Sequence, residues 1–131
     1  MSTHSPALPL NRAGVVVRIG GELRFLVAQA VRRFLPTPAL SQIAGSDLTM
    51  ALVDGQVLAI IAVGPRGSAL TVCEVAGELV GLLGADPEAV GFFEADGSGV
   101  SYRGERAPAL DVTELVRSSV RGAVVEREAH A

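Results

Sequence analysis

Short runs of β-branched and aliphatic residues, separated by turn signals, dominate the middle of the chain. Gly20-Gly21 separates the first two runs, and Asp54-Gly55 separates two later ones. Such residue pairs suit two-residue hairpin turns, in which one or both residues need a positive φ. We therefore predict a tight antiparallel hairpin at each position, with strands over residues 15–19 and 22–27 in the first and 48–53 and 56–63 in the second.

Further runs with strand character follow at residues 69–75, 78–83, 90–93 and 100–103. Pro36 and Pro38 should end the segment that follows the first hairpin, because proline cannot donate to a strand ladder. The residues from Gly84 to Pro87 should form a loop before the run at 90–93. Short strands with turns about every 8–12 residues are typical of a β-barrel or β-sandwich rather than a parallel α/β sheet.

The C-terminal part of the chain has a different pattern. Leu115, Val116 and Val120 recur at helical spacing, and either Asp111 or Thr113 could cap a helix that contains them. Gly122 interrupts this pattern. We expect one short helix after the last strand.

The predicted core is aliphatic, because only 4% of the residues are aromatic and none is Trp. Residues 57–63 include no polar side chain, so we expect both faces of that strand to be buried. Cys73 lies inside another apolar run and should be a buried, unreactive thiol. The residues expected in the core are Val57, Leu58, Ile60, Ile61, Val72, Val75, Val80, Leu82 and Leu83, with Cys73 beside them.

Composition narrows the class of partner. The 131 residues are 49% hydrophobic and 19% charged, which is typical of one globular domain and excludes a disordered chain. A net charge of −3 argues against binding to nucleic acid or to an anionic membrane. We see neither a signal peptide in the first eleven residues nor an apolar run long enough to span a bilayer, so we expect a cytoplasmic protein without membrane insertion.

Residues that could support catalysis are few and scattered. His4 and His130 are at opposite ends of the sequence, and Cys73 has no basic neighbour in sequence to activate it. Glu74 and Glu78 could form an acid–base pair in principle, but solvated charges are the simpler interpretation. The stretch from Asp96 to Gly99 indicates an ordinary turn. We predict no catalytic residues, no cofactor and no metal site, and hence no enzyme.

Five segments taken in order resemble the CheW-like domains of bacterial chemosensory adaptors. They cover the opening hairpin, a strand that ends in proline, the central hairpin, a segment with a packed glycine-leucine pair, and the closing hairpin with its short helix. The segments are residues 15–27, 31–36, 53–61, 75–83 and 100–115, and the resemblance extends over about residues 12–118.

The resemblance implies an all-β fold of two small, intertwined five-stranded barrels with SH3-like topology and a short C-terminal helix. It implies a flexible tail at residues 1–11, the CheW-like domain at 12–120, and a helix end or tail at 121–131. The implied function is that of a non-catalytic adaptor or scaffold, which binds a chemosensory histidine kinase, a receptor or a related signalling protein through surface grooves. The oligomeric state is left open. The partner-binding residues that it suggests are Asp54, Gly55, Gln56, Val80, Leu82 and Leu83.

The chain also departs from the family pattern at three positions. Asp54 stands where relatives usually have Arg, Ala59 where they usually have Pro, and Ala62 near a usual Asp or Asn. The connection over residues 64–68 is shorter than is common in relatives. A reversed charge at a hairpin tip alters partner choice and encounter rate more than it alters the fold.

Two other functions remain open. The chain could be a small-ligand-binding β-barrel that acts as a sensor, or a small enzyme whose site has no recognisable motif. An interior filled by aliphatic side chains favours the adaptor, whereas a cavity lined by a few polar groups favours the sensor.

Overall fold

The computed structural model describes residues 10–42, 49–65 and 69–118. Eleven strands and one 3-10 helix occupy most of these residues, and an α-helix covers residues 112–118. The expected all-β fold is therefore confirmed. In order, the elements are β1 (Asn11–Ile19), β2 (Glu22–Val27), η1 (Ala28–Ala30), β3 (Val31–Pro36), β4 (Leu40–Gln42), β5 (Thr49–Val53), β6 (Gln56–Ala62), β7 (Ala69–Val75), β8 (Glu78–Leu83), β9 (Asp86–Asp96), β10 (Gly99–Tyr102) and β11 (Glu105–Ala107).

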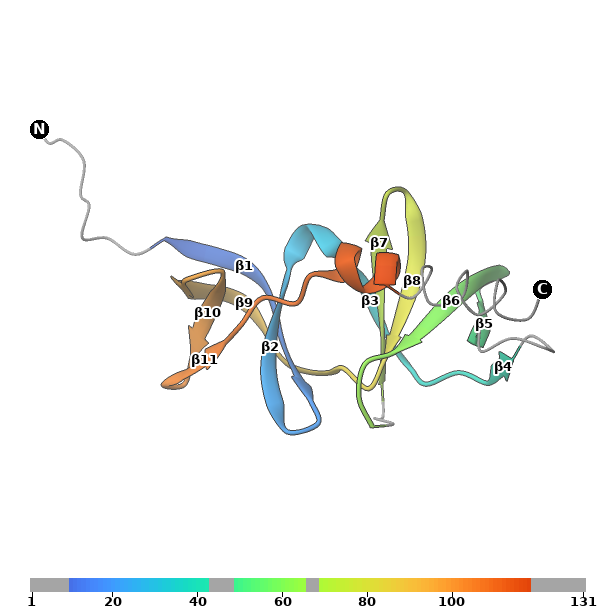
Figure 1. Ribbon diagram of the computed structural model, residues 1–131, viewed down its shortest axis with the longest axis horizontal. Helices are drawn as coiled ribbons and strands as arrows, with labels where there is room; N and C mark the ends of the chain where they lie inside the picture. Colours follow the sequence, from blue (N-terminus) through green and yellow to red (C-terminus); the bar gives the residue numbers. More distant parts are fainter. Residues whose placement is uncertain (1–9, 43–48, 66–68, 119–131) are drawn as a thin grey trace, which may run out of the picture.

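The strands form two sheets that divide the chain in an unusual way (Figure 1). The first sheet has the order β11-β10-β9-β1-β2, so it combines the beginning and the end of the described chain. The second sheet has the order β3-β7-β8-β6-β5-β4 and comes from the middle alone. The second sheet thus has six strands rather than the five expected, because the short β4 adds an edge strand that the sequence pattern did not predict.

Two-residue turns join the two strands of each predicted hairpin, as the residues at these positions indicate. Gly20 and Gly21 have φ values of 56° and 89°, and Asp54 and Gly55 have 50° and 79°. Positive φ at both positions is the geometry whose twist matches that of paired strands. Both predicted hairpins are confirmed.

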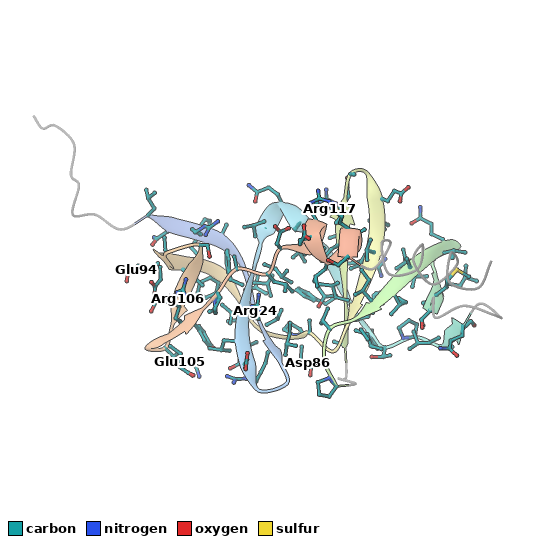
Figure 2. The ribbon with its side chains drawn as sticks, viewed as in Figure 1. Arg24, Asp86, Glu94, Glu105, Arg106 and Arg117 are labelled. Carbon is teal, nitrogen blue, oxygen red and sulfur yellow. The ribbon has the colours of Figure 1, made fainter. Side chains whose placement is uncertain are left out.

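The first sheet closes on itself through the segment after β11. The Phe25 amide donates to the Pro108 carbonyl and the Leu110 amide donates to the Phe25 carbonyl, each over 2.8 Å. Arg24 strengthens the closure, because its Nη2 donates to the Ala109 carbonyl over 3.1 Å (Figure 2). This contact pairs β2 with residues near the end of the described chain and leaves little open edge on the first sheet.

β9 begins earlier than the sequence pattern predicts. The expected loop over residues 84–87 is shorter, and Asp86 and Pro87 already pair with β1. The β1–β9 register shifts beside Pro87, which is where a sheet tolerates proline. Glu88 lies at this shift and accepts two hydrogen bonds from Arg18, at 3.1 and 3.0 Å. The hydrogen bonds and charge of Arg18 lower the pKa of the Glu88 carboxyl.

Three hydrophobic clusters fill the molecule. One lies within the first sheet, one within the second, and the third lies between the sheets under the α-helix. We call the third the inter-sheet cluster; its buried members are Val15, Val17, Leu26, Cys73, Leu82, Ala85 and Val112.

Most of the predicted core is confirmed, with one clear error on β6. Leu58, Ile60, Val72, Val80, Leu82 and Leu83 are buried, and Ile61 and Val75 are partly buried. Val57, in contrast, is 60% exposed, and Ala59 and Ala62 are exposed too. The prediction that both faces of this strand are buried was wrong: on the face that carries Val57 and Ala59, none of the described elements covers the part of β6 next to the hairpin tip.

The C-terminal helix begins as expected. The Glu114 amide donates to Asp111 Oδ1 over 3.0 Å, so Asp111 rather than Thr113 is the N-cap. Val112 belongs to the inter-sheet cluster, and Leu115 and Val116 pack against it. Val120 and Gly122, which belonged to the same prediction, lie outside the described residues, as does most of the tail expected before residue 12.

Candidate functional site: an inter-sheet groove and a hairpin tip

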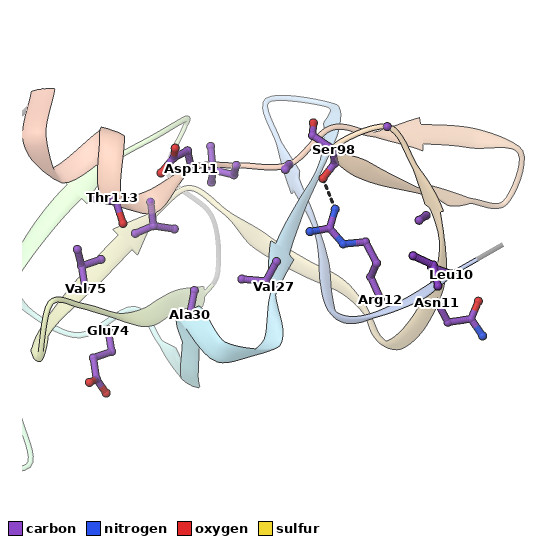
Figure 3. Close-up of a pocket in the computed structure, with 15 residues that line it drawn as sticks. Leu10, Asn11, Arg12, Val27, Ala30, Glu74, Val75, Ser98, Asp111 and Thr113 are labelled. Carbon is purple, nitrogen blue, oxygen red and sulfur yellow. Dashed lines mark hydrogen bonds between the residues drawn. The ribbon is translucent and has the colours of Figure 1, made fainter. Parts of the chain in front are cut away.

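The first candidate site is an open groove of about 810 Å³ where the two sheets meet (Figure 3). β1 and the β9–β10 turn line one end, β2 and η1 the middle, and β7 with the start of the helix the other end. Aliphatic side chains such as Val27, Val75 and Leu110 form much of its wall. We call it the inter-sheet groove; its lining residues are Leu10, Asn11, Arg12, Val27, Ala30, Glu74, Val75, Ala95, Gly97, Ser98, Ala109, Leu110, Asp111, Val112 and Thr113.

Arg12 supplies the polar group at the first-sheet end of the groove. Its guanidinium donates to the Ser98 carbonyl and lies 5.4 Å from the centroid of the buried Phe25 ring. These contacts hold the cation in place at the edge of the groove (Figure 3). The result is a fixed positive charge beside an apolar wall.

Carboxylates lie at the opposite end. Glu74 accepts a hydrogen bond of 2.6 Å from Arg32 Nε, and Asp111 caps the helix. Because Glu74 is paired with Arg32, the groove has the Arg12 cation at one end and the Asp111 carboxylate at the other, with aliphatic side chains between them. Such an arrangement suits a protein segment with apolar anchors and charges of both signs.

The second candidate site is the tip of the β5–β6 hairpin. Asp54 is exposed there, as predicted, but it is not a free charge, because its carboxylate forms an ion pair with Arg33 on β3. Gly55 and Gln56 are exposed beside it. No pattern in the sequence indicated the Arg33 contact, because β3 and the β5–β6 hairpin are not neighbouring strands and meet only when the second sheet curls.

Val80, Leu82 and Leu83, the other three residues suggested for partner binding, lie inside the protein. They are 5%, 0% and 6% exposed. A partner could not contact these side chains unless the fold opened. Of the six residues suggested for partner binding, the three that are exposed are Asp54, Gly55 and Gln56.

The residues weighed for catalysis do not come together. Val75 pairs with Glu78, so Glu74 and Glu78 point to opposite faces of the β7–β8 hairpin. Within the described ranges, no group of three or more His, Cys, Asp or Glu could hold a metal ion. His4 and His130 lie outside the described residues. The stretch from Asp96 to Gly99 is a tight turn between β9 and β10, as expected.

Cys73 is buried in the inter-sheet cluster, and burial raises the pKa of its thiol to about 11. We expect a maleimide or iodoacetamide to label Cys73 slowly in the native protein and rapidly in denaturant, because the thiolate is the reactive species. Mass spectrometry of the labelled protein at pH 7–8 with and without urea measures both rates. Equal rates in the two conditions would contradict the burial of Cys73.

A smaller pocket of about 330 Å³ lies at the end of the second sheet. Ser41, Gln42 and Thr49 supply its polar groups, and aliphatic side chains supply the rest. It adjoins residues 43–48, which lie outside the described residues.

The two sheets, the groove between them and the short C-terminal helix give this chain a CheW-like fold. The crystal structure of the scaffolding protein TtCheW from Thermoanaerobacter tengcongensis aligns with it at a TM-score of 0.66. The alignment covers 82% of this chain and 92% of that protein, with 14% sequence identity. Sequence comparison finds neither a matching family model nor a matching curated protein. The fold that the ordered motifs suggested is therefore confirmed by the structure.

In the part of the chain that the structure describes, no helix has both the length and the apolar character needed to cross a membrane.

Proposed function

We propose that this protein is a non-catalytic adaptor of a bacterial chemosensory-type system that works in the cytoplasm and binds other proteins. The observation that carries the proposal is the CheW-like fold across 82% of the chain, combined with an open groove at the sheet junction. The partners that fit best are a chemosensory histidine kinase or a receptor.

The filled sheet interiors support an adaptor over a ligand sensor. Phe25, Val16 and Val100 fill the first sheet, and Leu58, Leu70 and Val72 fill the second. These buried aliphatic and aromatic side chains fill the interior of each sheet, which favours binding at the surface. The 330 Å³ pocket with its three polar residues is the place where a small ligand would be sought in the alternative.

The groove can be tested by placing a charge in it. Ala30 lines the groove, whereas Ala28 in the same 3-10 helix is exposed and does not line it. We predict that Ala30→Glu reduces the capture of the kinase or receptor from the native cell, and that Ala28→Glu does not. The reason is that a carboxylate desolvated against Val27 and Val75 by a bound segment would be unfavourable.

Pull-down of the tagged protein followed by mass spectrometry measures this effect, and circular dichroism checks that each variant is folded. Equal capture by both variants would exclude the inter-sheet groove as the binding surface. Capture of metabolic enzymes alone, with no signalling protein, would contradict the adaptor function itself.

The hairpin tip can be tested through its charge. We predict that wild type binds a standard chemosensory kinase weakly, and that Asp54→Arg increases affinity about two- to fivefold at low salt, a change of up to about 1 kcal/mol. Moderate salt should reduce this gain, because exposed charges are screened. Titration calorimetry at two ionic strengths measures the change.

Arg33→Ala is the control for this test, because it breaks the ion pair without reversing the charge at the tip. If Arg33→Ala increases affinity as much as Asp54→Arg, loss of the ion pair explains the effect. If neither variant changes affinity, Asp54 acts only as a turn residue, for which its φ of 50° suits it well.

A further inference from the structure

The outer face of the β5–β6 hairpin carries exposed apolar side chains that the described residues leave uncovered. Leu52 and Val57 lie directly opposite each other and are 68% and 60% exposed. The next pair is Met50, which is partly buried, and Ala59, which is exposed. Paired residues share one face of a hairpin, so the four form one surface. We call these four residues the hairpin patch.

The hairpin patch continues a surface that is buried elsewhere. Parallel pairing of β6 with β8 places Ala59 beside Val80 and Ile61 beside Leu82 on one face of the second sheet. Leu82 belongs to the inter-sheet cluster, and Ile61 packs against it. The same sheet face is thus covered at one end and bare at the other.

The α-helix is part of that cover, and the chain continues beyond it. Val112, Leu115 and Val116 contact the inter-sheet cluster, and the described helix ends at residue 118. In Figure 1 it lies over β7, with β8, β6 and β5 following to one side. Thirteen residues follow, and they include the adjacent apolar residues Val124 and Val125, six and seven positions beyond the described helix.

The remaining chain is long enough to reach the hairpin patch. From Ile61 to Val57 the distance along β6 is about 13 Å at the usual rise of a strand. Thirteen residues span about 20 Å even as a helix, and more when extended. The patch is therefore within reach of the segment that follows the helix.

We propose that residues 119–131 dock on the hairpin patch, with Val124 and Val125 against Leu52 and Val57. A second copy of the chain is a poorer occupant, because four side chains are far fewer than the roughly 20–30 residues per partner of a stable interface. A tethered segment also has an effective concentration in the millimolar range, which a separate protein must overcome. The docked segment would lie next to Asp54, and this inference does not depend on what binds at the hairpin tip.

Cross-linking of introduced cysteines tests the proposal in the full-length chain. In a Cys73→Ala background, one variant carries Val57→Cys with Val124→Cys, and its control carries Val90→Cys with Val124→Cys. Val90 is 70% exposed on β9 of the first sheet, so it matches Val57 in accessibility but not in position. Docking should make the 57–124 pair form an intramolecular disulfide on the order of tenfold faster than the 90–124 pair, because only the former are held together.

Two outcomes would overturn the proposal. Equal rates for the two pairs would show that the segment does not prefer the hairpin patch. A disulfide-linked dimer through residue 57 would assign the patch to a second copy instead. As a separate measurement, hydrogen exchange of residues 119–131 should become faster in Leu52→Glu and stay unchanged in Val90→Glu. Failure of this test would leave the adaptor proposal intact, since kinase or receptor capture is measured independently.

Discussion

Truncation of Leu82 to alanine is expected to lower the free energy of unfolding by about 2–5 kcal/mol. Leu82 is fully buried in the inter-sheet cluster, where β8 meets residues from β1, β2 and the α-helix. Removing its side chain leaves a cavity at the junction of the two sheets, where little can move to fill it, since both sheets are anchored by their own clusters. Urea denaturation followed by circular dichroism measures the loss.

Val90→Ala provides the control for this measurement. Val90 is an aliphatic residue in a long strand, but its side chain is mostly exposed. Its truncation should change stability by no more than about 0.5 kcal/mol. If the two substitutions cost the same, the inter-sheet cluster does not hold the sheets together and the assignment of the core is wrong.

Gly99→Ala is expected to destabilise the protein by about 3 kcal/mol, at the upper end of the usual effect of overpacking. A Cβ at this position would lie 2.0 Å from the Ala107 carbonyl oxygen and 2.7 Å from Pro108 Cα. Both atoms belong to the backbone that closes the first sheet against β2. The clash cannot be relieved by a side-chain rotation, so β10 and β11 would have to separate. Thermal or urea denaturation measures the effect.

Gly97→Ala is the matched control in the same turn. Gly97 has a φ of 61°, and the only close neighbour of an added Cβ is the flexible side chain of Arg106. The substitution should therefore cost about 1–2 kcal/mol, from the left-handed backbone alone. A larger loss for Gly97→Ala than for Gly99→Ala would contradict the close packing of β10 on the closing segment.

Local chemistry predicted the parts of this fold that depend on neighbours in sequence. Gly20-Gly21 and Asp54-Gly55 specify their turns because positive φ is a local requirement, and Asp111 caps its helix through an amide three residues away. The parallel pairing of β6 with β8 depends on how the second sheet assembles, so no short pattern indicates it. The exposure of Val57 was missed because an apolar run indicates that a strand is hydrophobic but does not indicate which element covers it.

The candidate site was less accessible to sequence reasoning than the fold. The inter-sheet groove joins residues as distant in sequence as Arg12 and Asp111, and its aliphatic wall resembles any core segment. Asp54 was singled out because it differs from the family pattern, and its exposure was predicted correctly. Its partner Arg33 could not be identified, because several arginines in the sequence could have paired with it equally well.

The division of the chain between the sheets has a consequence for folding during synthesis. All strands of the second sheet lie between residues 31 and 83, so all of them emerge from the ribosome before β9 does. The first sheet is completed later, because β1 pairs with β9 and β2 pairs with the segment around Ala109, and both of these emerge after the second sheet. Until then the β1–β2 hairpin has no strand on either side, and its apolar residues are exposed. The nascent chain is therefore prone to aggregation during this interval.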